Sequence, residues 1–180
     1  WNWTTAEIKV LHKKGPANRP ENYRPIALLN LLESIMSQIV YRRLIKVAPD
    51  KMDRRQNGFL PGKSGRVPVF ELLQTTKKAK QGKKKRVIIY VDFRKAFDSL
   101  EHGTLLQILK RMGCPTHITD NVIGRIYRSA GARLKFGKGE FSNRFAQTKG
   151  IRQGSTLSPL LFILCLDWAM LRVKEGMQEK

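Results

Sequence analysis

Three short stretches of this 180-residue chain combine residue types that can bind phosphate groups or metal ions. The first stretch is Arg86–Asp98, in which the apolar run Val87–Val91 ends on the carboxylate of Asp92. An unbroken apolar run made mostly of β-branched residues predicts a strand that is buried on both faces. Such a strand can hold Asp92 rigidly as a metal ligand. Asp92 can equally cap the turn that follows, and this stretch leaves both interpretations open.

The second stretch, Gly150–Pro159, is a loop with a glycine at position 154 that leads into a helix. Ser158 is a typical N-cap residue and Pro159 a typical first helical residue. The helix that they begin continues to about Val173 and is apolar almost all round, which predicts that it lies in a core.

A third stretch, Gln56–Gly65, contains Gly62, Lys63 and Ser64, which are similar to the end of a phosphate-binding loop. Asn57 occupies the place of the first glycine of that motif, and no apolar strand leads into it. We therefore reject a nucleotide hydrolase. A basic loop rich in glycine can still contact phosphate through its backbone N–H groups and through Lys63.

The net charge points to a polyanionic partner. The chain has 35 Lys and Arg against 14 Asp and Glu, which gives +21 at pH 7. Such an excess repels itself in a compact protein, so a nucleic acid is the first candidate partner. The same balance is found in histone-like and ribosomal proteins, so charge indicates the partner and not the chemistry. The two cysteines, Cys114 and Cys165, have no metal-ligand spacing.

The hydropathy pattern gives no sign of a membrane partner. The longest apolar segment, Leu160–Leu166, is too short to span a bilayer. The N-terminal residues Trp1–Trp3 carry no signal-peptide pattern. We expect an intracellular chain, and one that can be a piece of something longer.

Several elements are predicted to hold the chemical groups in the first half of the chain. Alternating residues predict a strand over Ala6–Leu11, and a loop follows through Pro20–Pro25. Pro25 makes Arg24 extended, so its guanidinium projects from a stiff backbone, although Arg24 can also be an ordinary surface residue in a turn. A core-facing helix is predicted from residues at helical spacing, which are Leu32, Ile35, Met36, Ile39, Val40 and Leu44.

A second helix is predicted from about Pro68 to Lys80. It runs into the basic segment Lys77–Arg86, which we interpret mainly as a solvated loop with incidental phosphate contacts.

In the second half, Asp98 is predicted to be an N-cap. The helix after it carries Leu105, Leu109 and Met112 on one face, and another helix follows over Ile118–Arg128. A β-hairpin is predicted from Ala132–Phe136 and Phe141–Gln147, with a glycine turn at 137–139.

Four segments in this order resemble the motifs of one enzyme family. Residues 91–98 (VDFRKAFD) and 150–162 (GIRQGSTLSPLLF) resemble the first two palm motifs of reverse transcriptases. Residues 22–30 (NYRPIALLN) and 56–59 (QNGF) resemble the fingers motifs of the same family. The type is similar to the non-LTR, LINE-like retrotransposons, with group II intron enzymes as near relatives, and retroviral enzymes fit poorly. The resemblance covers the chain from about Lys9 to Trp168.

The resemblance implies an RNA-directed DNA polymerase. Such an enzyme joins a primer 3′-hydroxyl to the α-phosphate of a deoxynucleotide, and two Mg²⁺ ions, or Mn²⁺ in their place, stabilise the attacking and leaving oxygens. It implies an RNA template, a DNA primer and a dNTP as partners, and a nuclear site of action.

The resemblance also assigns roles to individual residues. Asp92 matches the catalytic metal ligand, and the backbone carbonyl of Phe93 would support it. The ring of Phe97 would lie under the incoming sugar and collide with a 2′-hydroxyl, although Phe97 can also be a core residue. The remaining matches are contacts with the nucleotide: Arg24, Gln153, Gly154 and Lys63. Arg24 would bind the triphosphate, assisted by Lys13 or Lys14. Gly154 would allow the backbone to come close to the nucleotide, and Lys63 would contact a phosphate.

Two departures from the family pattern matter. Leu60 stands where the second fingers motif has an arginine, so Lys63 substitutes for that base or a phosphate contact is lost. The third palm motif, an aromatic-x-Asp-Asp hairpin that supplies the other metal carboxylates, does not occur up to Lys180. Since one carboxylate cannot hold two divalent ions, we expect no polymerase activity from these 180 residues alone.

We therefore predict an α+β chain. Residues 1–85 would form fingers, and residues 86–180 would form part of a right-hand palm with an antiparallel sheet packed on helices, without the third palm motif and the thumb. The alternative function is a non-catalytic, basic nucleic-acid-binding remnant. A purely structural basic protein leaves the four ordered motifs unexplained.

Overall fold

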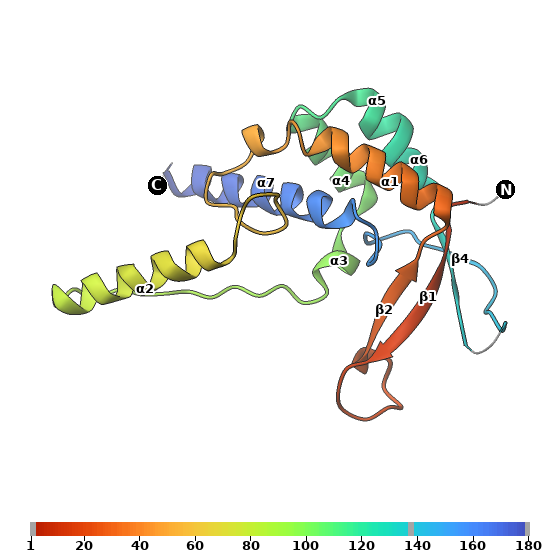
Figure 1. The fold of residues 1–180 in the computed structure, drawn as a ribbon, viewed down its shortest axis with the longest axis horizontal. Coiled ribbons are helices and arrows are strands. Elements are labelled where there is room, and N and C mark those ends of the chain that lie inside the picture. The colour runs from red at the N-terminus through yellow and green to blue at the C-terminus, as the bar shows by residue number, and fades with distance from the viewer. Residues whose placement is uncertain (1–2, 137–138, 179–180) are drawn as a thin grey trace.

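One four-stranded sheet and a group of helices form the main body in the computed structural model, which describes residues 3–136 and 139–178 (Figure 1). The strands are β1 (Thr5–His12), β2 (Tyr23–Leu28), β3 (Gly131–Leu134) and β4 (Phe145–Ala146), in the order β2-β1-β3-β4. The α+β class is thus confirmed. The predicted strand over Ala6–Leu11 is β1, whereas Tyr23–Pro25, expected in a loop, belongs to β2.

The sheet is mixed, so the prediction of an antiparallel sheet is wrong. Strand β1 pairs antiparallel with β2 and parallel with β3, and β3 pairs antiparallel with β4. A parallel neighbour requires a long crossover between the strands. Here the crossover includes the helices between β2 and β3, and these helices share the core with α7 (Ser158–Gln178), which follows the sheet.

The helical elements follow the predicted order closely. They are η1 (Pro20–Asn22), α1 (Leu31–Leu44), η2 (Pro49–Lys51), α2 (Arg66–Gln81), α3 (Ala96–Ser99), α4 (His102–Arg111), α5 (Thr116–Ile118), the π-turn η3 (Thr119–Ile123), α6 (Gly124–Arg128) and α7 (Ser158–Gln178). Three short pieces, α5, η3 and α6, together occupy the single helix that was predicted over Ile118–Arg128. No helix in the described ranges has the length and apolarity that a membrane crossing requires.

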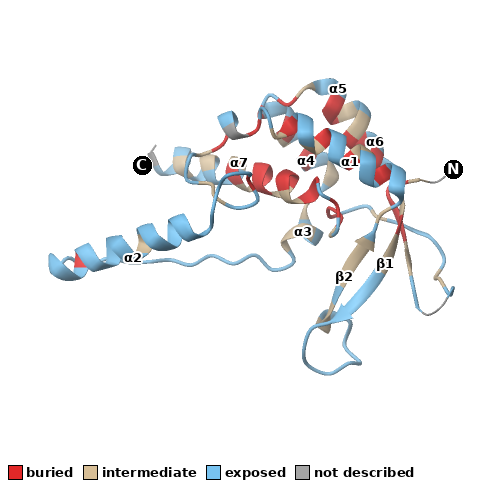
Figure 2. Cartoon of the chain, in the orientation of Figure 1, coloured by how far each residue is buried: buried red, intermediate tan, exposed pale blue. Residues whose placement is uncertain are grey.

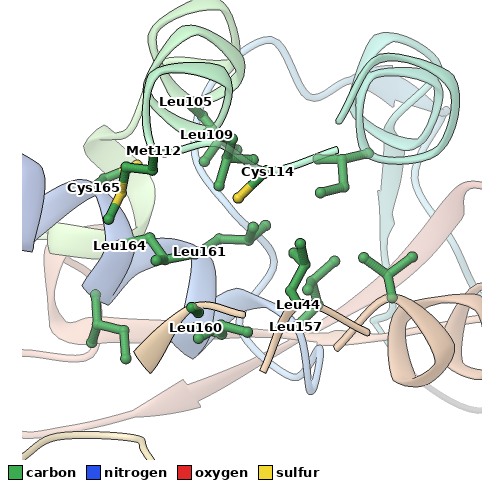
Figure 3. Packing of buried hydrophobic residues seen from close by; sticks show 14 of the residues in the cluster. Leu44, Leu105, Leu109, Met112, Cys114, Leu157, Leu160, Leu161, Leu164 and Cys165 are labelled. Atoms are coloured by element: carbon green, nitrogen blue, oxygen red, sulfur yellow. The ribbon is translucent and has the colours of Figure 1, made fainter. Parts of the chain in front are cut away.

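The core lies where α7, α4 and α1 pack together. Leu160, Leu161 and Leu164 of α7 are completely buried, as are Leu105 and Leu109 of α4 (Figure 3). Burying each such side chain stabilises the fold by roughly 1.5–3 kcal/mol. The predicted burial of the helix after Ser158 is confirmed for its first half, and the predicted core face of α4 is confirmed as well.

Helix α1 buries only part of the predicted face. Val40 and Leu44 are buried as predicted, whereas Leu32, Ile35 and Ile39 are 51%, 45% and 41% exposed. Glu33 and Ser37 complete the buried face. The apolar residues of α1 did not predict its whole buried face, because the charged residue Glu33 points into the protein. Its partner there cannot be found from sequence periodicity.

Helix α2 and the segment after it, up to the start of α3 at Ala96, form an arm that extends from the body (Figures 1 and 2). The helix itself was predicted correctly over Pro68–Lys80. The predicted buried strand Val87–Val91 is wrong, because this segment pairs with no other strand in the described ranges and leaves Val87 88% and Ile89 80% exposed. A strand needs a neighbour to satisfy its backbone groups, and the apolar run alone does not provide one.

Two smaller predictions differ from the structure in part. Helix α3 is preceded by Lys95 at the N-cap position, with φ 51°, and Asp98 lies inside the helix, so the predicted N-cap role of Asp98 is wrong. The predicted β-hairpin is shorter, with β3 and β4 paired and a single bridge between Lys135 and Phe141. Residues 137–138 of its predicted turn lie outside the described residues. The predicted boundary between fingers and palm at residue 85 stays a prediction. Helix α1, on the fingers side of that boundary, shares a core with α4 and α7 on the palm side.

Candidate active site

A cavity of about 810 Å³ brings three separate parts of the chain together. Its walls come from the β1–β2 hairpin, from the segment around α3 and from the loop that precedes α7. Six of the seven residues to which the sequence assigned a site role line this cavity; they are Arg24, Asp92, Phe93, Phe97, Gln153 and Gly154.

The β1–β2 hairpin presents Arg24 and Lys13 to the cavity. The loop between the strands is closed by polar contacts: the Asn22 side chain donates to the Pro16 carbonyl at 2.8 Å, and the Tyr23 hydroxyl donates to the Ala17 carbonyl at 2.8 Å. Two residues of the fingers motif thus close the loop that precedes β2, and Arg24 is the second residue of that strand.

Asp92 and Phe93 reach the cavity from the exposed arm and not from the end of a buried strand. Asp92 lines the cavity, and its role as a metal ligand stays a prediction. In the described ranges the segment before it has no strand partner, so Asp92 does not stand at the end of a buried strand.

Phe97 is fixed in the core beside α7. Its ring stacks on Phe162, with centroids 5.1 Å apart and an interplanar angle of 18°. The N–H of Ile151 donates to the Phe97 carbonyl at 2.8 Å, and the N–H of Gly150 donates to Leu100 at 2.8 Å. Phe97 is thus a packing residue that also lines the cavity, and its contact with a sugar stays a prediction.

Gln153 is oriented by Asp98. The Gln153 side-chain N–H donates to a carboxylate oxygen of Asp98 at 3.0 Å. A carboxylate only accepts hydrogen bonds, so the amide nitrogen must face Asp98 and the amide oxygen remains available as an acceptor. Both residues line the cavity.

Gly154 packs against the backbone of β2. Its φ is +122°, and a Cβ at this position would lie 2.4 Å from the Ala27 carbonyl oxygen. The Ala27 N–H donates to the Gln153 carbonyl at 2.7 Å. The close approach that requires glycine is therefore to the chain itself, and contact with a nucleotide or template stays a prediction.

An ion pair below the loop was not foreseen from the sequence. Arg152 and Glu33 are 2% and 1% exposed, and the guanidinium donates to the Glu33 carboxylate and to the Thr4 carbonyl. A further bond goes to the Gly131 carbonyl at 3.3 Å. Burial raises the pKa of Glu33 and lowers the pKa of Arg152, and the opposite charge of each partner counteracts the shift. The available signal was an arginine directly before Gln153, with a glutamate in the first turn of α1.

Lys63 does not line this cavity. Its ammonium donates to the Arg54 carbonyl at 3.4 Å, and its role as a phosphate contact stays a prediction. Leu60 is 8% exposed and belongs to the core cluster. The position at which the family has an arginine is thus a packing position in this chain.

The described residues do not form a complete metal site. Among them, no group of three or more His, Cys, Asp or Glu side chains could hold a metal ion. Asp98 accepts from Gln153, Asp120 pairs with Lys110 at 2.8 Å, and Asp167 accepts from the Asp53 backbone. Asp92 and the Phe93 carbonyl are hard oxygen donors of the kind that Mg²⁺ prefers, but they are too few to hold two ions.

The match to a protein family defines the class of this chain. A family model described as "Reverse transcriptase (RNA-dependent DNA polymerase)" matches residues 11–179. The chain belongs to the reverse transcriptase family, as the four motifs predicted.

The relatives it resembles are proteins of retrotransposable elements. The chain is 33% identical over 164 residues to "Retrovirus-related Pol polyprotein from type-2 retrotransposable element R2DM" of Drosophila melanogaster, a match that covers 90% of this chain and 15% of that protein. It is 26% identical over 165 residues to the Pol polyprotein of a type-1 retrotransposable element R2 from Popillia japonica, with 92% and 23% covered. The chain thus spans about a quarter or less of the length of these relatives.

Proposed function

We propose that this chain forms the nucleotide-binding part of an RNA-directed DNA polymerase, with fingers residues and the first part of a palm around the 810 Å³ cavity. The observation that supports this most is that residues from three distant motifs line one cavity: Arg24, Asp92 and Gln153. These motifs are separated by up to 129 positions in the sequence (153 − 24 = 129), so their meeting is a property of the fold.

In this proposal the chain contributes position and charge. Nucleotidyl transfer requires little covalent work from the protein, and catalysis depends on orientation and on neutralising charge. Arg24 and Lys13 of the β1–β2 hairpin bind the triphosphate of the incoming dNTP, and Lys95 lines the same cavity from the segment around α3. Phe97 lies under the sugar and excludes a 2′-hydroxyl, and the amide oxygen of Gln153 accepts a hydrogen bond from the nucleotide.

Asp92 and the Phe93 carbonyl would supply some of the ligands for the Mg²⁺ ions that the complete enzyme uses to lower the barrier for phosphoryl transfer. Because the described residues supply too few ligands, we infer that these 180 residues alone do not extend a primer. Template-directed, Mg²⁺-dependent extension by the purified chain would contradict this inference.

Nucleotide binding tests the proposed function. The purified chain is titrated with a dNTP and Mg²⁺ in the presence of an RNA template and a DNA primer. A charge-assisted bond to phosphate contributes about 1.5–3 kcal/mol, so Arg24→Ala should weaken dNTP binding roughly 10- to 100-fold. Arg19→Ala is the matched control, because Arg19 is an exposed arginine of the same hairpin that does not line the cavity. Equal effects of the two substitutions would contradict the proposal.

The alternative, a nucleic-acid-binding remnant without catalysis, is favoured by the net charge of +21 and by the exposed basic run Lys77–Arg86. Salt-sensitive binding is expected in both cases, because counterion release needs no active site. The two differ in Asp92→Asn, made in a longer chain that does extend a primer: the polymerase loses its extension rate, and an unchanged rate removes Asp92 from the mechanism.

A further inference from the structure

The loop that carries Gln153 and Gly154 is attached to the body at two levels. At the cavity, the Gln153 carbonyl accepts from the Ala27 N–H at 2.7 Å, on the edge of strand β2 that faces away from β1. Below it, the side chain of Arg152 enters the core and is 1% exposed. Arg152 directly precedes Gln153 and is itself among the residues that line the cavity, so the buried anchor and the cavity wall are adjacent in the chain.

Three separate elements hold this anchor. Arg152 donates to the Glu33 carboxylate in the first turn of α1 and to the carbonyl of Thr4 just before β1. It also reaches the carbonyl of Gly131, at the start of β3, at 3.3 Å. A planar guanidinium offers several donors in a fixed geometry, so Arg152 defines the position and the orientation of the loop relative to the sheet and to α1.

A buried ion pair is a weak source of stability, since two desolvated charges recover little more than they lose. Its structural effect at this place is therefore mainly positional. The loop approaches β2 closely at the next turn of the chain: Gly154 has φ +122°, and the Ala27 carbonyl occupies the place where a Cβ would be.

We propose that Arg152 is a positioning residue for the cavity: its buried contacts with Glu33, Thr4 and Gly131 hold Gln153 and Gly154 docked against β2 before a nucleotide binds. The positional part rests on the fold alone, and the nucleotide part rests on the proposed function. In this role Arg152, which is only 2% exposed, acts through the position of Gln153 and Gly154.

The test removes the ion pair without leaving a buried charge. The double variant Arg152→Met and Glu33→Leu replaces both partners by apolar side chains of similar size, which often preserves folding. Hydrogen exchange of the Ala27 amide reports whether the loop is docked, because that amide donates to Gln153. The Met112 amide, which donates to Ile108 at 2.9 Å in the core, is the internal control.

We expect the Ala27 amide to exchange about tenfold faster or more in the folded double variant, while the Met112 amide is unchanged. The Kd for a dNTP with Mg²⁺ should rise by about tenfold in the same variant. An Ala27 amide that stays fully protected would overturn the proposal and leave Arg152 with a purely structural role.

Arg152→Lys is measured alongside in case the double variant does not fold. It keeps the charge beside Glu33 but cannot reproduce the planar set of donors, so we expect an intermediate exchange rate at Ala27. An exchange rate equal to that of the wild type overturns the proposal. If the wild-type chain binds no dNTP, the proposed function fails and the nucleotide part fails with it, while the exchange rates still decide the anchoring.

Discussion

The helical body and the arm differ in how their apolar residues are used. In the body, Leu161 and Leu105 are completely buried. In the arm, Phe70 is 62% exposed, Leu73 63% and Tyr90 79%. Both regions have apolar side chains at regular positions in the sequence, yet most of those in the arm stay exposed within the described residues. The difference shows that an apolar pattern predicts an element, and that its burial depends on what lies elsewhere in the chain.

The largest expected effect separates the two regions directly. Leu161→Ala removes a completely buried side chain and should lower the free energy of unfolding by about 2–5 kcal/mol. Leu73→Ala, the matched substitution in the arm, should change it by less than about 0.5 kcal/mol. Denaturant unfolding of both variants measures this. A similar loss from Leu73→Ala would mean that the arm is packed in solution.

A second comparison concerns two glycines with positive φ. Gly62, at φ +70°, has open space where a Cβ would be, whereas Gly154 has the Ala27 carbonyl there. Both alanine variants should be strained by about 1–3 kcal/mol. Gly154→Ala should be at least about 1 kcal/mol worse, because β2 must also move, and it should weaken dNTP binding, which Gly62→Ala leaves unchanged. Equal losses of stability would show that the loop is not tightly docked on β2.

The body should also lose stability in alkali. Burial raises the pKa of the Cys165 thiol to about 12, well above the ordinary value of a cysteine. The thiol therefore ionises in the unfolded chain first, and the stability that is present below pH 9 is lost as the pH rises toward 12. The slope contributed by this residue approaches about 1.4 kcal/mol per pH unit. Unfolding curves between pH 8 and 10 should show a smaller decline for Cys165→Ala, and identical declines would contradict the burial of this thiol.

The smallest effect concerns the arm alone. Brief trypsin treatment should cleave within Lys77–Arg94 before it cleaves at Arg111 or Arg152, because local opening is easiest where few apolar contacts form. Mass spectrometry of the early fragments identifies the sites. First cleavage within the body would contradict the exposure of the arm.

Much of the body could be predicted from local sequence. Helix α4 and the first half of α7 have the expected buried residues, α4 because its apolar residues recur at helical spacing and α7 because it is apolar almost all round. Helix α7 continues to Gln178, beyond its predicted end near Val173. Strand β1 was predicted from alternation alone. Among the cavity residues, Asp92 and Arg24 were singled out by their sequence neighbours as well as by motif resemblance, and Gln153 by resemblance alone.

Other features depended on partners that are distant in sequence. Among the residues that the structure describes, the segment Val87–Val91 has no strand neighbour of the kind that its composition suggested. Glu33 is buried because Arg152, 119 residues away, faces it. Asp98 bonds to Gln153 instead of capping α3, and Gly154 accommodates β2. No local pattern distinguishes these side chains from exposed polar ones.

The most direct test of the account is a hydrogen-exchange footprint of a dNTP with Mg²⁺ on the purified chain with primer and template. Binding in the cavity predicts slower exchange in residues 23–28 and 150–157, with no change in α2. Slowing confined to α2 and the basic run Lys77–Arg86 would contradict a nucleotide site in the cavity and favour a nucleic-acid-binding remnant.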